Sequence, residues 1–132
     1  MANRQKVSSG TSWEALAGYS RAIRAGQWVH VSGTTATDEM GQVVGVDNPY
    51  EQTIYIIQKI EKALNQLGAS LKDVVRTRIY IVNDEQWEPI ARAHGEIFAD
   101  IRPANTLIAI RGIIGEGYLV EIEADALIGD NE

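Results

Sequence analysis

The chain contains no cysteine among its 132 residues. This absence excludes disulfide bonds, a thiol nucleophile and a metal site built on thiolates. Histidine is also scarce, because only His30 and His94 are present and they fall in different predicted elements. Two isolated histidines, without a cluster of other ligands at matching spacing, do not make a metal-binding pattern. We therefore predict no metal site.

Long apolar runs are absent as well. No stretch approaches the ~20 apolar residues that a membrane-spanning helix needs. Met1 to Gly10 is polar and lacks the apolar core of a signal peptide. We expect a cytoplasmic protein without a membrane partner.

Basic residues are fewer than acidic ones. Lysine and arginine number 12 against 18 aspartates and glutamates, which gives a net charge of −6 and a pI near 4.9. Nucleic-acid binding depends on neutralising phosphates with a basic surface. The charge balance therefore argues against nucleic acid and against anionic membranes as partners.

What the chain does have is enough apolar material, 45% of residues, for one core. The length fits a single domain over residues 1–132. Ser20 to Gly33 alternates like two short strands around a turn at residues 25–27. The polar residues 34–48 indicate a loop that contains a short strand at residues 42–45.

The first long helix has the clearest signals. Asn48 is placed to cap it, Pro49 suits the first helical position, and Glu51 completes a capping box. Gly68 ends it. One apolar stripe follows helical spacing: Tyr50, Thr53, Ile57, Ile60, Leu64 and Leu67.

The second half of the chain predicts three strands and one helix. Residues 112–117 between the last two strands resemble a hairpin loop. Pro89 must lie close to the first turn of the helix, which carries His94 on its apolar face, in a position typical of a buried and hydrogen-bonded histidine. The predicted bounds are Val74–Val82 (strand), Asp84–Asp100 (helix), Asn105–Arg111 (strand) and Tyr118–Ile128 (strand).

Two helices can cover only one face of such a sheet. The alternation of the strands predicts which residues point each way. We expect the helices to cover Tyr118, Val120, Ile122, Ala124, Ala126 and Ile128, then Val75, Thr77, Ile79 and Ile81, then Thr106, Ile108 and Ile110. The open face would then hold Glu121, Glu123, Asp125, Arg76, Arg78, Tyr80, Leu107 and Leu119. Such a mixed face fits a surface buried against another copy of the protein and fits a solvated surface equally well.

Four short motifs carry a family resemblance. They are Gly18-Tyr19-Ser20-Arg21-Ala22, Val31-Ser32-Gly33-Thr34, Arg102-Pro103-Ala104-Asn105-Thr106 and Leu119-Val120-Glu121-Ile122-Glu123-Ala124. With their spacing and the two helices, these motifs resemble the Rid family, also called the YjgF family, over almost the whole chain from residue 18 to residue 128.

The resemblance implies an α+β fold like that of chorismate mutase, a six-stranded mixed sheet with two helices on one face. It also implies a homotrimer with small-molecule clefts between subunits and no metal or organic cofactor. Members with the best-known activity hydrolyse enamines and imines such as 2-aminoacrylate. Tyr19, Ser32 and Glu121 match the family pattern, which makes Glu121 the candidate catalytic residue. The candidate substrate-binding residues are Tyr19, Ser32, Asn105 and Arg102.

The chain departs from the deaminating members at three positions. Where they carry an arginine directly after Pro-Ala, this chain has Asn105, which donates hydrogen bonds but has no charge to hold a substrate carboxylate. Their helical asparagine is Ala91 here, and their glutamine after Ser-Gly is Thr34. Candidates for the missing guanidinium are Arg102 before Asn105, and Arg111 and Arg24.

Several alternatives stay open at this point. Glu121 either orients a water molecule in a cleft or forms a cross-strand ion pair with an arginine such as Arg78. Ser32 lacks a visible base, so we expect it to donate a hydrogen bond rather than to act as a nucleophile. The function is either hydrolysis of an imine or enamine with altered substrate choice, or ligand binding and regulation without catalysis. A ribonuclease or translation inhibitor is the least favoured reading.

Overall fold

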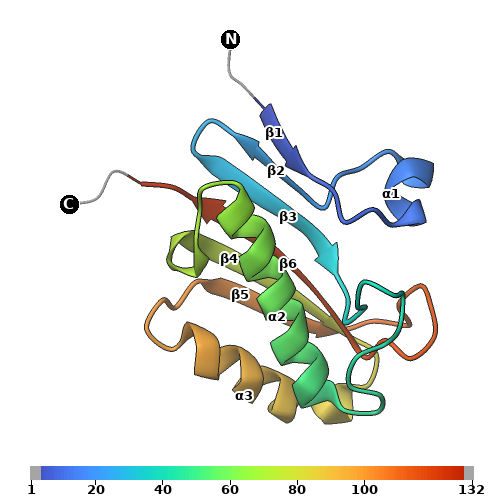
Figure 1. The fold of residues 1–132 in the computed structure, drawn as a ribbon. Coiled ribbons are helices and arrows are strands. Elements are labelled where there is room, and N and C mark those ends of the chain that lie inside the picture. Colours follow the sequence, from blue (N-terminus) through green and yellow to red (C-terminus); the bar gives the residue numbers. More distant parts are fainter. Residues whose placement is uncertain (1–3, 130–132) are drawn as a thin grey trace.

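The computed structural model describes residues 4–129. In chain order, its elements are β1 (Arg4–Val7), α1 (Ser12–Ala17), β2 (Ala22–Ala25), β3 (Trp28–Thr34), α2 (Pro49–Gln66), β4 (Val74–Ile81), α3 (Trp87–Phe98), β5 (Ala104–Ala109) and β6 (Val120–Leu127), with 3-10 turns at Leu71–Asp73 and Asp84–Gln86. The strands form one sheet in the order β1-β2-β3-β6-β4-β5 (Figure 1).

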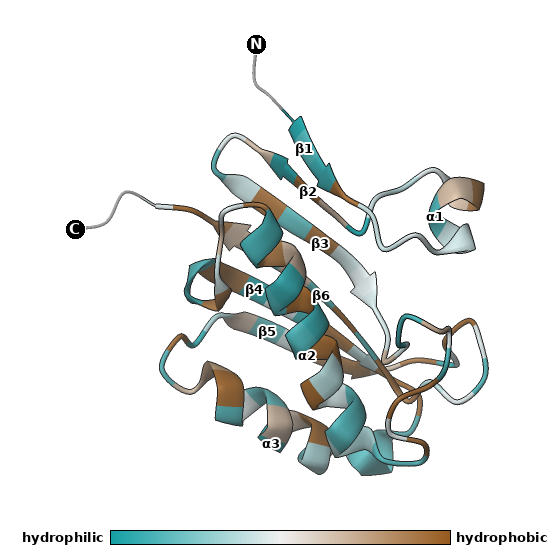
Figure 2. Ribbon diagram, viewed as in Figure 1, coloured by the Kyte–Doolittle hydropathy of each residue, from teal (hydrophilic) through white to brown (hydrophobic). Residues whose placement is uncertain are grey.

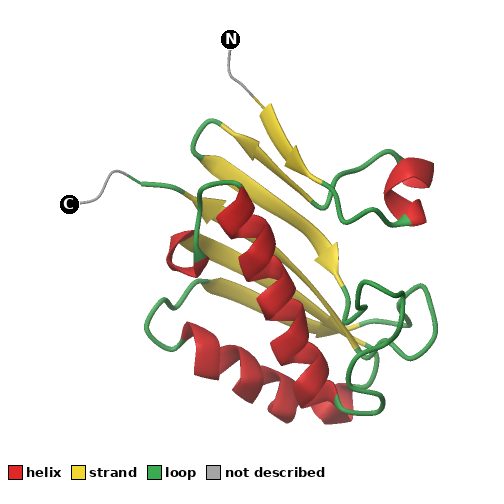
Figure 3. Ribbon diagram, viewed as in Figure 1, coloured by secondary structure: helices red, strands yellow, loops and turns green. Residues whose placement is uncertain are grey.

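The sheet is mixed. β4 and β5 run parallel and are joined through α3, as a parallel pair requires, whereas the other neighbouring strands run antiparallel. The two long helices, α2 and α3, lie on the same side of the sheet (Figure 3). The predicted α+β architecture, a six-stranded mixed sheet with two helices on one face, is confirmed.

Helix α2 begins where the sequence predicts. The Asn48 side chain accepts a hydrogen bond from the Glu51 backbone N–H at 3.0 Å, and Pro49 lies in the first turn. Only this half of the capping box forms, because the Asn48 N–H bonds instead to the Gly45 carbonyl. At the other end, Gly68 has φ +84°, a left-handed conformation that glycine adopts without strain.

One hydrophobic core lies between the helices and the sheet. In β6 the predicted alternation is confirmed, because Val120, Ile122 and Ala124 are buried. The same alternation appears as brown and teal bands along β3 in Figure 2. Tyr50, a predicted member of the α2 stripe, lies outside the core, since it is 37% exposed. Trp87 at the start of α3 is 56% exposed.

The faces of β5 are the reverse of the prediction. Its parallel pairing with β4 places Asn105 beside Thr77 and Leu107 beside Ile79, and both partners are buried on the helix-covered face. Leu107 therefore packs against the core, whereas Ile108 is 46% exposed on the open face. Both sets of alternating residues in β5 contain apolar side chains, so only the pairing with β4 decides which set is buried.

Three further predictions are corrected. The segment between β5 and β6 is not a hairpin loop, because β6 pairs with β3 and β4 and the chain crosses from the edge of the sheet to its middle. A bulge between Val74 and Arg76 buries Val74 and leaves Val75 41% exposed, since one extra residue reverses the alternation. The short strand predicted at residues 42–45 is a single β-bridge between Thr37 and Val43.

The segment before β2 contains two elements that the sequence did not predict. β1 adds a polar edge strand to β2, and α1 follows it. Glu14 of α1 is buried and accepts hydrogen bonds from the Ser8 hydroxyl at 2.8 Å and the Ser9 N–H at 3.1 Å. Of the helices in residues 4–129, none is both long and apolar enough to cross a bilayer.

Candidate functional site

A group of five residues gathers where β3 ends and β6 begins. We call it the Glu121 cluster, and its members are Tyr19, Arg21, Ser32, Gly33 and Glu121. The pairing of β3 with β6 shifts register between Val31 and Thr34, so Ser32 and Gly33 lie in an irregular stretch of the ladder. Such irregularities redirect side chains and are frequent beside functional sites.

Gly33 lies directly against the Glu121 carboxyl group. A Cβ atom at position 33 would be 2.5 Å from Oε2 and 3.1 Å from Cδ of Glu121. Any larger residue would therefore force the carboxylate to move. This close approach gives a physical reason for glycine in the Val-Ser-Gly motif, and it links that motif to the Val-Glu-Ile-Glu-Ala motif of β6.

The Glu121 carboxylate is half-buried and has no hydrogen-bond or ion-pair partner within residues 4–129. Burial raises the pKa of its carboxyl group, while the nearby Arg21 charge acts in the opposite direction. A carboxyl group whose pKa is raised toward neutral pH is suited to accepting and returning a proton.

The predicted alternative for Glu121, an ion pair with Arg78, is wrong. Arg78 instead contacts Glu123 and Asp125, with Nη1 3.2 Å from a carboxylate oxygen of each. Tyr80 donates a hydrogen bond to Glu123 at 2.7 Å. Arg78 thus pairs with two carboxylates in the middle of the open face, and Glu121 at its end takes no part.

Tyr19 and Ser32 are linked to Glu121 through their neighbours, because Gly33 follows Ser32 and Arg21 faces Tyr19. The Ser32 hydroxyl donates to the Ser20 carbonyl at 2.7 Å, so it is occupied in holding the β2–β3 connection. Neither histidine is hydrogen-bonded to Ser32, and no general base therefore activates it. Tyr19 is 40% exposed, and its ring centre lies 5.8 Å from Cζ of Arg21.

Asn105 lies apart from this cluster in a single subunit. It is on the helix-covered face, where its side-chain N–H donates to the Thr77 hydroxyl at 2.9 Å. That hydroxyl is also hydrogen-bonded to Nε2 of His94 at 2.9 Å, which confirms the predicted hydrogen-bonded histidine. The sheet register aligns Asn105 with Ala124, three residues from Glu121 and so ~10 Å along the strands.

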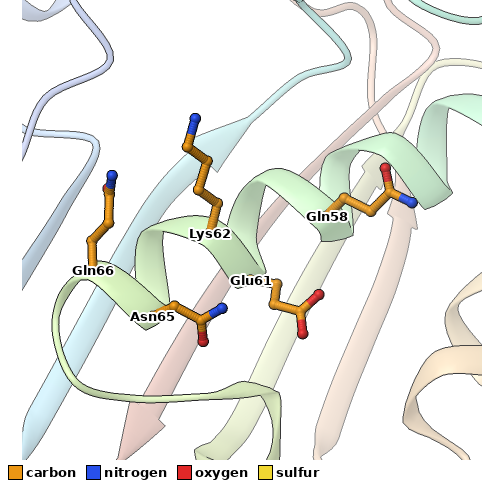
Figure 4. Close-up of a pocket in the computed structure, with 5 residues that line it drawn as sticks. All are labelled: Gln58, Glu61, Lys62, Asn65 and Gln66. Carbon is orange, nitrogen blue, oxygen red and sulfur yellow. The ribbon is translucent and has the colours of Figure 1, made fainter.

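Arg102 also lies away from the Glu121 cluster. It precedes β5 with φ +55° and lines a shallow pocket with Lys72, Val75 and Pro103. A second shallow pocket follows the exposed side of α2, lined by Gln58, Glu61, Lys62, Asn65 and Gln66 (Figure 4). Neither depression contains a member of the Glu121 cluster.

Two basic groups that the motif analysis did not select have charges that act on the cluster. Arg21 donates from Nη2 to the Gly33 carbonyl at 2.5 Å. Lys59 of α2 donates to the carbonyls of Thr35 and Thr37 at 2.8 and 2.9 Å. Burial lowers the pKa of Lys59 to about 8, and the charge of Arg21 acts in the same direction.

No group of three or more histidine, cysteine, aspartate or glutamate side chains in the described range is arranged to hold a metal ion. The chemistry open to the cluster is therefore that of a carboxylate, a guanidinium and hydroxyl groups. These suit proton transfer and the recognition of a polar ligand.

The sequence matches known proteins over nearly its full length. Residues 10–128 match the family model described as endoribonuclease L-PSP. The chain is 35% identical over 125 residues to an uncharacterized protein of Streptomyces coelicolor, covering 95% of this chain and 92% of the other. It is 32% identical over 111 residues to the 3-aminoacrylate deaminase RutC of Acinetobacter baylyi, with 84% and 87% covered.

Solved structures share the fold. The crystal structure of Rv2704 from Mycobacterium tuberculosis, described as a member of the YjgF/YER057c/UK114 family, matches with a TM-score of 0.86 and 42% identity, covering 96% of this chain and all of that one. The structure of E. coli TdcF with bound serine matches with a TM-score of 0.77 at 16% identity, covering 84% and 88% of the two chains, which is a likeness of fold alone.

Proposed function

The chain belongs to the YjgF/Rid family, and from this premise we propose that it hydrolyses the C=N bond of a small imine or enamine at clefts between its subunits. The observation that carries the proposal is Glu121, a half-buried carboxylate without a partner in residues 4–129, held against Gly33 and beside Arg21. The name of the Acinetobacter baylyi relative, a 3-aminoacrylate deaminase, supports the same reaction class.

The reaction needs one group that moves a proton in both directions. Water adds to the carbon of the protonated imine while Glu121 takes one of the water protons, which gives a neutral carbinolamine. Glu121 then returns that proton to the nitrogen, the C–N bond breaks, and ammonia leaves as the hydroxyl group releases its proton to Glu121 and becomes the carbonyl. An enamine enters the same route after protonation at carbon gives the protonated imine. General acid–base help of this kind contributes ~10²–10⁴-fold in rate.

A cleft between subunits accounts for the separation of the candidate residues. Asn105 and Arg102 lie at the β5 edge, and Glu121 lies at the other end of the strands on the open face. One site that includes both groups must therefore combine the β5 edge of one copy with the Glu121 cluster of another. We propose a homotrimer, the arrangement that the family resemblance implies.

Ligand binding without catalysis is the second candidate. The observation that favours it is Asn105, whose amide N–H is already used in bonding to Thr77 and which has no charge to hold a carboxylate. A ribonuclease has less support, because the protein carries a net charge of −6 and its two histidines lie on opposite faces of the sheet.

The test is ammonia release from a panel of substrates. 2-Aminoacrylate generated in situ, 3-aminoacrylate, and imines of neutral and bulkier amino acids are offered to the wild type, to Glu121→Gln and to Asn105→Arg. Glu123→Gln is the matched control, because Glu123 is on the same strand and face but has partners in Arg78 and Tyr80.

We expect Glu121→Gln to lower kcat/KM by about 100-fold or more, and Glu123→Gln by far less. Turnover that survives in Glu121→Gln would overturn the proposed mechanism. If no substrate is turned over by the wild type, although one of them binds, ligand binding replaces catalysis as the function. If Asn105→Arg turns over a substrate and the wild type does not, ligand binding is likewise the function of the native protein.

A further inference from the structure

Arg21 is the basic residue of the Glu121 cluster, and the motif analysis did not select it as a ligand-binding group. It lies directly before β2, and its Nη2 donates to the carbonyl of Gly33, the residue against which Glu121 lies. Its guanidinium also faces the Tyr19 ring, with Cζ 5.8 Å from the ring centre. Arg21 is thereby held in one position next to the candidate catalytic carboxylate.

The hydrogen-bonding capacity of Arg21 is only partly used. Its Nε is buried and has no hydrogen-bond partner within residues 4–129. A guanidinium has five N–H donors, and leaving a buried donor of a charged group unpaired is costly. Because Nε is enclosed by protein atoms, a ligand carboxylate would bond to Nη1, which has no hydrogen-bond partner within residues 4–129 and is not among the buried atoms.

The charge of Arg21 is not neutralised by Glu121. The two residues form no ion pair, although the charge of Arg21 opposes the burial that raises the pKa of Glu121. The charge of Arg21 also acts on Lys59 and on the carboxylate of Glu14. Glu14 is already hydrogen-bonded to Ser8 and Ser9, and none of the carboxylates in residues 4–129 forms an ion pair with Arg21.

Three other arginines are more fully engaged by the protein than Arg21, whose one hydrogen bond goes to the carbonyl of Gly33. Arg24 donates to the carbonyls of Gly26 and Leu67, both at 2.9 Å. Arg78 is shared between two carboxylates of the open face, and Arg92 pairs with Glu88 at 2.7 Å on α3. The replacement guanidinium predicted at Arg24 is therefore unavailable to a ligand, and Arg102 lies away from the cluster.

We propose that Arg21 binds the carboxylate of a short 2-oxo, 2-imino or enamine acid, and so replaces from β2 the arginine that Asn105 does not supply from β5. The fork of the guanidinium fits a carboxylate in a way that a lysine does not. The proposal rests on the proposed function for placing the reacting carbon beside Glu121. The binding of the carboxylate itself does not depend on catalysis.

The test uses two unreactive probes, pyruvate and its uncharged amide, pyruvamide. Titrations of the full chain are followed by NMR through the backbone amides of Tyr19 and Ser32. The variants are Arg21→Gln, Arg21→Lys and Glu121→Gln, with Arg24→Gln as the matched control, because Arg24 lies on the other face of β2 and is bonded to backbone carbonyls. Thermal unfolding confirms that each variant is folded.

We expect the wild type to bind pyruvate at least about tenfold more tightly than pyruvamide. Arg21→Gln should lose this preference. Arg21→Lys keeps the positive charge and should retain only part of the preference for pyruvate. Arg24→Gln should bind as the wild type does. Glu121→Gln should bind pyruvate as tightly or more tightly, because a nearby negative charge is gone.

Equal binding of the two probes by the wild type would overturn the proposal, as would undiminished pyruvate binding in folded Arg21→Gln and Arg21→Lys. The outcome is separable from the proposed function. Pyruvate binding that depends on Arg21, without any imine turnover, would support Arg21 as the carboxylate-binding residue and contradict the proposed hydrolysis. Turnover that depends on Glu121 but not on Arg21 would support the hydrolysis and contradict the role of Arg21.

Discussion

Glu121 and Glu123 are two residues apart on β6 and point to the same face of the sheet, yet their surroundings differ. Glu123 accepts hydrogen bonds from Arg78 at 3.2 Å and from Tyr80 at 2.7 Å. Glu121 has no such partner in the described chain and rests against the backbone of Gly33. A carboxylate whose acceptor positions are filled stabilises the structure. One that is half-buried and unfilled is free to act on a ligand.

The contrast arises from the strand that lies next to each residue. Glu123 is opposite Arg78 in the regular pairing of β4 and β6, so a cationic partner is built into the register. Glu121 lies beside the irregular end of β3, where the ladder shifts and a glycine leaves space for the carboxylate. Whether a carboxylate on this face is paired or is available to a ligand therefore depends on how β6 pairs with the neighbouring strand at that position.

The largest effect should come from filling the space beside Glu121. Gly33→Ala would place a methyl group 2.5 Å from the carboxylate oxygen, so Glu121 must move. We expect imine hydrolysis to fall by about 10²-fold, as a misplaced catalytic group does. Steady-state ammonia release measures this effect.

The matched control for this change is Gly95→Ala on α3, where an added Cβ meets nothing within 4 Å and φ is not positive. It should keep full activity and raise stability by about 0.5–1 kcal/mol, because alanine favours a helix. Equal activity losses in the two variants would show that the Gly33 effect is not specific to Glu121.

A smaller effect should come from removing the partner of Glu123. Arg78→Met takes the guanidinium away from Glu123 and Asp125 and makes their surroundings more like those of Glu121. The groups are partly exposed, so we expect a loss of no more than about 1 kcal/mol in the free energy of unfolding. Urea unfolding measures this loss, and a variant as stable as the wild type would contradict the view that these contacts stabilise the structure.

The smallest effect should be a pH-dependent stabilisation in Glu121→Gln. Because burial raises the pKa of Glu121 in the folded state, its favourable contribution to stability is present at low pH and is lost as the pH rises through the folded pKa. Glutamine removes that loss. The variant should therefore exceed the wild type in stability at pH 7 by less than about 1 kcal/mol, after allowance for solvent screening. The difference should vanish below about pH 4.

Urea unfolding at the two pH values measures this difference. Glu123→Gln serves as the comparison, because it should be less stable than the wild type at pH 7, having lost its contacts with Arg78 and Tyr80. A Glu121→Gln variant less stable than the wild type at pH 7 would mean that the carboxylate has a stabilising partner.

The sequence predicts the parts of this fold that depend on local signals. Asn48, Pro49 and Gly68 mark the ends of α2 because caps and left-handed turns need particular residues. The alternation of β6 identifies its buried face because one set of its residues is charged. The prediction for β5 has its two faces reversed because neither set of alternating residues in this strand is mainly charged. Its orientation depends on a pairing between distant segments, which local alternation does not report.

The candidate site divides in the same way. Tyr19, Ser32 and Glu121 are selected by their motifs, and their roles stay predictions. The structure connects them through Gly33, which lies against Glu121, and Arg21, which contacts Gly33 and Tyr19. Arg21 stands inside the first motif but is not selected, because its neighbours belong to β3 and β6 and become visible only in the folded chain. The signal that was available is Gly33, since a glycine within a strand pattern indicates a bulge or a close approach.

The position of β6 has a consequence for how the protein folds. β6 follows the other five strands in the chain but lies between β3 and β4, so it joins β1–β3 to β4–β5. Until β6 is in place, the facing edges of β3 and β4 have no strand between them. Unpaired edges favour association between chains. A folding intermediate that lacks β6 should therefore be the form of this domain most prone to associate with other chains.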